Sequence, residues 1–141
     1  MKKILIDTCI HIDWMNQGLR EEIMLGHGFV RYLSAVVAME LRAGAQHRGA
    51  RDAVSAVIRA YRSAGRLVVP SAEVFERAGA VLRQLKLAGR DVRQASLCND
   101  VLIALTARSI GASVVTGNVD DFTAIRRIER FDLMAAIPAS S

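Results

Sequence analysis

The chain has 141 residues, a net charge of +5 and a hydrophobic fraction of 52%. This length suits one domain with a real core, and this hydrophobic fraction excludes a disordered chain. No apolar run approaches the roughly 18 residues that span a bilayer, and Asp7 interrupts the N-terminal apolar stretch too early for a signal peptide. We therefore expect a single domain over residues 1–141, with no membrane contact and a cytoplasmic location.

Arginine dominates the basic residues, with 16 arginines among the 19 Lys and Arg residues. One interpretation is solubility combined with the amino-acid usage of a GC-rich genome. The other is attraction to a polyanion, because a guanidinium group pairs with phosphate through two parallel hydrogen bonds. Composition alone leaves both interpretations open.

The cysteines and histidines do not indicate a zinc site or a disulfide framework. Cys9 and Cys98 are too few and too far from any pattern, so we expect both to be small buried residues. His11, His27 and His47 have no ligand spacing and are expected to be structural or surface residues.

Short apolar runs alternate with helical periodicities along the chain. The first half predicts a strand over 3–6, a helix over 8–16, a helical turn over 21–25, a strand over 29–33 and helices over 35–45 and 50–64. The second half predicts a strand over 67–69, a helix over 73–88, a polar loop over 89–94, a nearly all-apolar central helix over 95–110, a strand over 113–116, a short helix over 120–125 and an edge strand over 131–134. Ser34 and Ser71 are expected to cap the helices that follow them.

Strands separated by helices predict an α/β fold. We expect a three-layer sandwich in which a mainly parallel central sheet of four to five strands has helices on both sides. In such sheets, sites form beyond the carboxyl ends of the strands. Asp7 directly follows the first strand, and the segment from Thr116 to Asp121 follows the strand over 113–116, so both are expected at that edge.

Acidic residues occur at four positions that apolar residues surround. Asp7 ends Ile4–Ile6, Glu40 lies on the apolar face of its helix, Asp100 opens an apolar run, and Asp120 and Asp121 follow the strand over 113–116. Each position has an ordinary alternative: an Asx-turn or helix cap for Asp7, a rim pair with Arg42 for Glu40, a helix cap for Asp100, and a helix start for the last two. Because buried carboxylates need partners, four such positions together favour one shared acidic pocket.

Oxygen ligands without sulfur or imidazole suit Mg²⁺, or Mn²⁺, rather than zinc. One or two such ions can activate a water molecule and stabilise a leaving oxygen, which is the chemistry of phosphodiester hydrolysis. The cation is also needed to admit the substrate, because bare carboxylates repel phosphate.

The same residues, in this order, resemble the PIN-domain ribonucleases, and in particular the VapC toxins of bacterial VapBC toxin–antitoxin systems. The resemblance covers nearly the whole chain and rests on four motifs: Ile6-Asp7-Thr8, Ser34 through Glu40-Leu41-Arg42-Ala43-Gly44, Asn99-Asp100-Val101-Leu102-Ile103-Ala104, and Val115-Thr116-Gly117-Asn118-Val119-Asp120-Asp121-Phe122. It implies a PIN-like fold and a magnesium-dependent endoribonuclease that acts as a toxin on RNA.

Carried over by this resemblance, the catalytic residues are Asp7, Glu40, Asp100 and Asp121. Asp7 and Asp100 are the implied principal metal ligands, and Glu40 holds a second metal or a metal-bound water. Thr116, Asn118 and Thr8 are implied to position water or substrate. The chain departs from the fullest family pattern at Asn118, where an aspartate would add charge, so Asp121 or Asp120 is the alternative fourth ligand.

Two rival functions remain open at this point. One is a catalytically idle PIN-like module that binds RNA or protein, and the other is a phosphatase, which would favour a second aspartate two residues after Asp7, where the chain has Cys9. The resemblance also implies a VapB-like antitoxin as partner and a homodimer. Trp14 and Met15 on the first helix belong either to the core or to an antitoxin groove.

Overall fold

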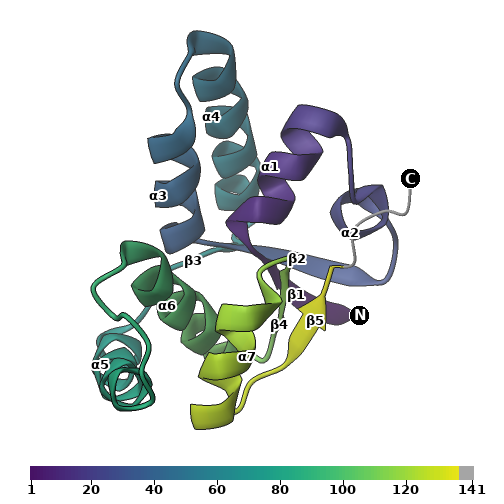
Figure 1. Ribbon diagram of the computed structural model, residues 1–141. Coiled ribbons are helices and arrows are strands. Elements are labelled where there is room, and N and C mark those ends of the chain that lie inside the picture. The colour runs from purple at the N-terminus through teal and green to yellow at the C-terminus, as the bar shows by residue number, and fades with distance from the viewer. Residues whose placement is uncertain (137–141) are drawn as a thin grey trace.

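The sheet at the centre of the molecule is parallel throughout. A computed structural model describes residues 1–136, and in it five strands pair in the order β3-β2-β1-β4-β5, with helices on both sides of the sheet (Figure 1). Because β1 lies in the middle and β4 beside it, their carboxyl ends meet at one edge of the sheet. The predicted α/β sandwich is confirmed.

The first half of the chain supplies three strands and four helices. In chain order these are β1 (Lys2–Ile6), α1 (Thr8–Gln17), α2 (Glu21–Leu25), β2 (Phe29–Ser34), α3 (Ala35–Gly44), α4 (Arg48–Ser63) and β3 (Leu67–Val68). Gly18 ends α1 with a φ of 65°, a left-handed conformation that suits glycine. The Ser34 hydroxyl accepts a hydrogen bond from the Val36 N–H at 3.1 Å, which confirms its predicted role as a cap.

The second half adds α5 (Ala72–Leu87), α6 (Ala95–Ser109), β4 (Ser113–Thr116), α7 (Val119–Ile128) and β5 (Leu133–Ala135). The Ser71 hydroxyl caps α5 by accepting from the Val74 N–H at 3.1 Å. Every residue of α6 from Asp100 to Ala107 is buried, so this helix is central, as its all-apolar sequence predicts.

Alternation along β1 divides the core between the two faces of the sheet. Leu5 packs in the larger cluster, which contains residues of α3, α4, α5, α6 and α7. Ile4 and Ile6 face the other way and pack in a smaller cluster with Ile10 of α1 and residues of α2. Both faces of the strand that carries Asp7 are therefore covered, which holds that residue rigidly at the strand end.

Several predicted boundaries and burials are corrected. Helix α4 begins two residues early because the His47 Nδ1 caps it, and α7 extends three residues beyond Ile125. The last strand begins at Leu133, after Phe131, which packs in the core instead. Cys9 and Cys98 are half-buried rather than buried.

Within residues 1–136, none of the helices combines the length and apolar character that a membrane crossing needs.

Candidate metal-binding and catalytic site

Asp7 occupies the junction between β1 and α1, where its carboxylate accepts hydrogen bonds from α1 and from β4. Its Oδ1 accepts the Thr8 N–H at 2.8 Å and so caps α1, and its Oδ2 accepts the Thr116 hydroxyl at 2.6 Å. The side chain is buried, with 5% exposure. The cap predicted as an alternative is therefore real, and it coexists with a contact to the end of β4.

Glu40 reaches the same edge of the sheet from α3. Its Oε1 accepts the Thr8 hydroxyl at 2.7 Å, and its Oε2 accepts the Asn99 amide at 3.3 Å. The alternative pairing with Arg42 is wrong, because the Arg42 guanidinium donates to the Ser55 hydroxyl. Glu40 therefore takes neutral hydrogen-bond donors from α1 and α6 and has no cation beside it among residues 1–136.

Asp100 is the most electrostatically perturbed acid of the site. It lies within α6, well after the N-cap residue Gln94, so the helix-cap alternative is wrong. Burial, first, and then the nearby charges of Asp7, Glu40 and Asp121 together raise the pKa of its carboxyl to about 8. The four predicted catalytic acids thus lie close enough to repel one another.

The segment between β4 and α7 links two of these acids through an amide. The Asn118 Nδ2 donates to the Asp100 Oδ2 at 3.0 Å and to the Asp121 Oδ2 at 3.3 Å. The Arg90 guanidinium, from the loop after α5, donates to the Asp121 Oδ1 at 2.8 Å and to the Asp120 Oδ2 at 3.1 Å. Asp120 points into solvent, whereas Asp121 belongs to the acidic network.

Thr116 is held in one orientation by its two contacts. Its hydroxyl donates to Asp7 and accepts the Asn118 N–H at 2.9 Å. The Cys9 sulfur lies 3.6 Å from the Asp7 Oδ2 and accepts the Gly117 N–H at 3.5 Å. Burial and the Asp7 charge raise the pKa of the Cys9 thiol, so it stays protonated beside the carboxylate.

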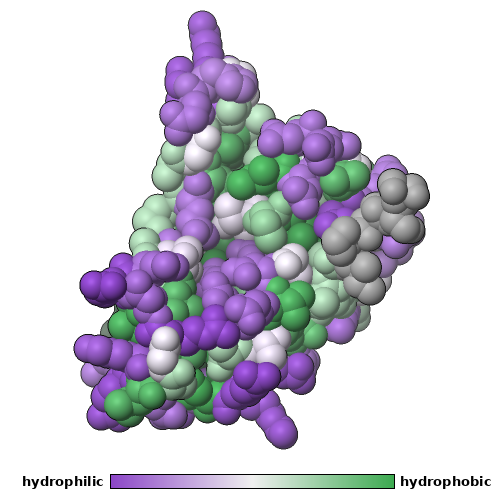
Figure 2. All heavy atoms as spheres, viewed as in Figure 1, coloured by the Kyte–Doolittle hydropathy of each residue, from purple (hydrophilic) through white to green (hydrophobic). Residues whose placement is uncertain are grey.

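The site is an acidic pocket at the carboxyl ends of β1 and β4, and hydrophilic residues gather there in the middle of Figure 2, above α7. All seven predicted site residues take part in one hydrogen-bonded network: Asp7, Thr8, Glu40, Asp100, Thr116, Asn118 and Asp121.

The donor chemistry of this pocket fits Mg²⁺ or Mn²⁺. The acids present carboxylate oxygens. Within residues 1–136, Asp121 pairs with Arg90, whereas Asp7 and Glu40 take neutral hydrogen-bond donors and leave their negative charge uncompensated near Asp100. No three His, Cys, Asp or Glu side chains within residues 1–136 form a ready-made metal-binding group. The carboxylate oxygens of the network nevertheless suit Mg²⁺, which takes one or two carboxylates directly and completes its shell with water.

Two participants were not predicted from the sequence. In the sequence, Asn99 stands out only as the first residue of the motif that contains Asp100, and Arg90 only as part of the polar loop over 89–94. Asn99 directly precedes Asp100, so its proximity to the site was a usable signal. No signal indicated Arg90, because its contacts with Asp120 and Asp121 depend on the path of the loop after α5.

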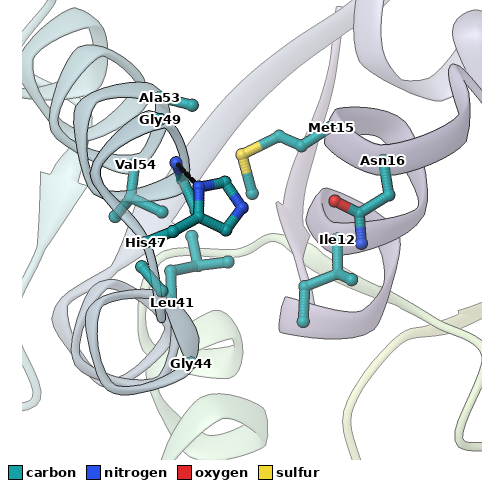
Figure 3. Close-up of a pocket in the computed structure, with 11 residues that line it drawn as sticks. Ile12, Met15, Asn16, Leu41, Gly44, His47, Gly49, Ala53 and Val54 are labelled. Carbon is teal, nitrogen blue, oxygen red and sulfur yellow. Dashed lines mark hydrogen bonds between the residues drawn. The ribbon is translucent and has the colours of Figure 1, made fainter.

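A second hollow lies between α1 and the α3–α4 hairpin, with a volume of about 270 Å³. Ile12 and Met15 face Leu41 and Val54 across it (Figure 3). Met15 packs against the larger core and also lines this groove. Trp14 is half-buried and does not line it.

Comparison with known proteins identifies the family. The PIN domain family matches residues 4–128. A search of curated proteins found no match.

Similar solved structures are toxin–antitoxin complexes. VapBC2 from Rickettsia felis, bound to a promoter DNA fragment, has a TM-score of 0.71 and 21% identity and covers 96% of this chain and 99% of that one. DNA-bound VapBC from Salmonella typhimurium has a TM-score of 0.67 and 27% identity and covers 96% of this chain and 98% of that one. VapBC-1 from nontypeable Haemophilus influenzae has a TM-score of 0.69 and 23% identity and covers 94% of this chain and 97% of that one. The chain therefore belongs to the PIN-domain family and has a fold of the VapC type.

Proposed function

We propose that the chain is a Mg²⁺-dependent endoribonuclease and the toxin of a toxin–antitoxin pair. The observation that carries this proposal is the convergence of Asp7, Glu40, Asp100 and Asp121 on one edge of the sheet, with the pKa of Asp100 raised to about 8. Membership of the PIN-domain family and the VapBC neighbours support it.

Asp7 and Asp100 are the residues that would hold the cation, because both are buried at the centre of the site, Asp7 at the end of β1 and Asp100 on α6. Bound there, Mg²⁺ would lower the pKa of a water molecule and neutralise charge on the phosphate oxygens. A phosphodiester is then no longer repelled by the acidic pocket.

The remaining polar groups orient the reactants. The Thr8 hydroxyl and the Asn99 amide fix both oxygens of Glu40, so this carboxylate is held in place to accept a proton from the attacking water. Thr116 fixes the Asp7 carboxylate, and Asn118 holds Asp100 and Asp121 at a set separation. Each acid thus has a fixed orientation before substrate arrives, which lowers the reorganisation cost of the reaction.

An antitoxin segment is the partner that we propose for the groove between α1 and the α3–α4 hairpin. The groove is lined mainly by apolar side chains, and Ile12 on its wall is 39% exposed. Ile12→Asp should prevent co-purification with a small protein encoded beside this gene, while RNA cleavage by the isolated variant persists. The homodimer stays a prediction, which light scattering on the purified chain checks.

The activity test compares Asp7→Asn with Asp13→Asn, a control on the same helix whose carboxylate lies 3.7 Å from Arg20, outside the acidic network. Wild type and Asp13→Asn should cleave structured RNA with Mg²⁺ and stop when EDTA is added, and Asp7→Asn should be inactive although folded by circular dichroism. Undiminished cleavage by Asp7→Asn would refute its role. Hydrolysis of p-nitrophenyl phosphate without RNA cleavage would favour a phosphatase, and no cleavage of either would favour an idle module.

A further inference from the structure

Three arginines surround a hollow at the C-terminal end of α7, away from the acidic pocket. The hollow has a volume of about 500 Å³, and its lining includes Arg126, Arg127 and Arg130 together with Thr123 and Asp132. All three arginines are exposed. In Figure 2 hydrophilic residues gather over this lower end of α7.

Within the described residues 1–136, these arginines differ from others nearby in forming no ion pair with an acid. Arg77 and Arg108 both donate to the buried Glu129, and Arg90 donates to Asp120 and Asp121. Within residues 1–136, no ion pair includes Arg126, Arg127 or Arg130, although Asp132 lines the same hollow. Three unpaired guanidinium groups around one hollow attract an anion with several acceptor oxygens.

Helix stability accounts for only part of this arrangement. Arg126 and Arg127 lie in the last turn of α7, where cations interact favourably with the helix dipole. Arg130 lies beyond the end of the helix, so it is not in the last turn and does not share this interaction with the dipole. The helix dipole therefore accounts for Arg126 and Arg127 but not for Arg130.

The position of the hollow relates it to the acidic pocket. Helix α7 begins at Val119, next to the site, and carries Asp121 in its first turn and Arg126 and Arg127 in its last, and Arg130 follows the end of the helix. At about 1.5 Å per residue, the arginines lie roughly 10 Å further along the helix axis. That is the length of about three stacked nucleotides.

We propose that the hollow formed by Arg126, Arg127 and Arg130 binds the phosphate backbone of the RNA on one side of the cleavage site. This inference rests on the proposed ribonuclease function. Phe131 at the hollow is only 4% exposed, so its ring is not available for base stacking. The contacts are therefore to phosphates, and they add affinity without selecting a base sequence.

The test measures binding of a fluorescein-labelled single-stranded oligoribonucleotide to variants in the Asp100→Asn background, which prevents cleavage. One variant carries Arg126→Gln, Arg127→Gln and Arg130→Gln. A matched control carries Arg51→Gln, Arg59→Gln and Arg62→Gln, which removes the same charge from the exposed face of α4. A third variant replaces the three α7 arginines with lysine and so keeps their charge.

Each phosphate contact on a single strand contributes about 0.7 to the salt dependence of log affinity. Between about 50 and about 200 mM salt, the parent and the α4 control should therefore lose about 20-fold more affinity than the α7 glutamine variant. The lysine variant should keep the parent's salt dependence. Circular dichroism checks that all variants are folded.

Cleavage separates this inference from the proposed function. With active Asp100 restored, the α7 glutamine variant should cleave a dinucleotide as the wild type does but show a higher KM for long RNA. Equal salt dependence in the α7 and α4 glutamine variants would overturn the inference while wild-type cleavage upheld the ribonuclease proposal. A wild-type protein that neither binds nor cleaves RNA would overturn both.

Discussion

Asp100→Asn removes the acid whose charge the metal-free fold disfavours. The pKa of Asp100 rises from its ordinary value of 3.8 to about 8, first through burial and then through Asp7, Glu40 and Asp121. The folded protein thus holds this proton more tightly than the unfolded chain does. Its stabilising effect is complete below about pH 4 and is lost as the pH rises through about 8.

The size of the effect follows from the two pKa values. One pKa unit corresponds to about 1.4 kcal/mol. At pH 7 the raised pKa of Asp100 therefore lowers the free energy of unfolding by at most about 4 kcal/mol, relative to low pH. Asparagine carries no charge and can still accept the hydrogen bond from Asn118. The free energy of unfolding of Asp100→Asn, relative to wild type, should therefore increase by about 3–4 kcal/mol between pH 5 and pH 8.

Urea unfolding in EDTA at several pH values measures this difference. Groups that do not interact with Asp100 contribute equally to both proteins and cancel in the comparison. Asp52→Asn, an exposed position on α4, serves as control and should show no such trend. Saturating Mg²⁺ at pH 8 should stabilise the wild type but not Asp100→Asn. If the difference in free energy of unfolding between Asp100→Asn and wild type did not change with pH, the repulsion between the acids of the site would be refuted.

Three further variants test separate parts of the structure. Asn118→Ala removes the amide that donates to Asp100, so the free energy of unfolding at pH 8 should fall by about 1–3 kcal/mol in urea titrations; an unchanged value would show that this hydrogen bond contributes nothing. Burial lowers the pKa of His11 from 6.5 to about 4, and the unfolded chain protonates first, so the stability of wild type relative to His11→Phe should fall by about 2 kcal/mol between pH 8 and pH 5, opposite in sign to the Asp100 contribution. His11→Phe should lose this acid sensitivity in thermal melts, and retention of it would assign the sensitivity to another group. Glu129→Gln weakens a buried carboxylate that two arginines contact, so it should destabilise the protein by about 1–3 kcal/mol, and a neutral result would show that both ion pairs are dispensable.

The sheet could be predicted because its strands are short apolar runs without alternation. Ile4–Ile6 and Ser113–Thr116 are buried on both faces, so no charged residue interrupts either run. Ser34 and Ser71 marked two helix starts through their side-chain chemistry. The cap formed by His47 was missed, since an imidazole nitrogen is an unusual acceptor at that position.

The acids of the site could be predicted because each interrupts an apolar pattern. Asp7 and Asp121 are placed at one edge by the parallel pairing of β1 and β4, and Glu40 and Asp100 by the inward faces of their helices. Arg90 could not be found in this way, because a loop has no periodicity from which the direction of a side chain follows. The cluster of Arg126, Arg127 and Arg130 likewise depends on how the chain turns after α7.

Cation binding between Asp7 and Asp100 is the central claim, and a crystal structure of the protein grown with Mn²⁺ tests it most directly. An anomalous difference map should show a peak within about 2.0–2.3 Å of one oxygen from each of these carboxylates. Thr116 and Asn118 should then contact the carboxylate oxygens that do not bind the ion. Saturating Mn²⁺ that gives no peak at this position, while all the acids keep their present hydrogen bonds, would contradict the claim.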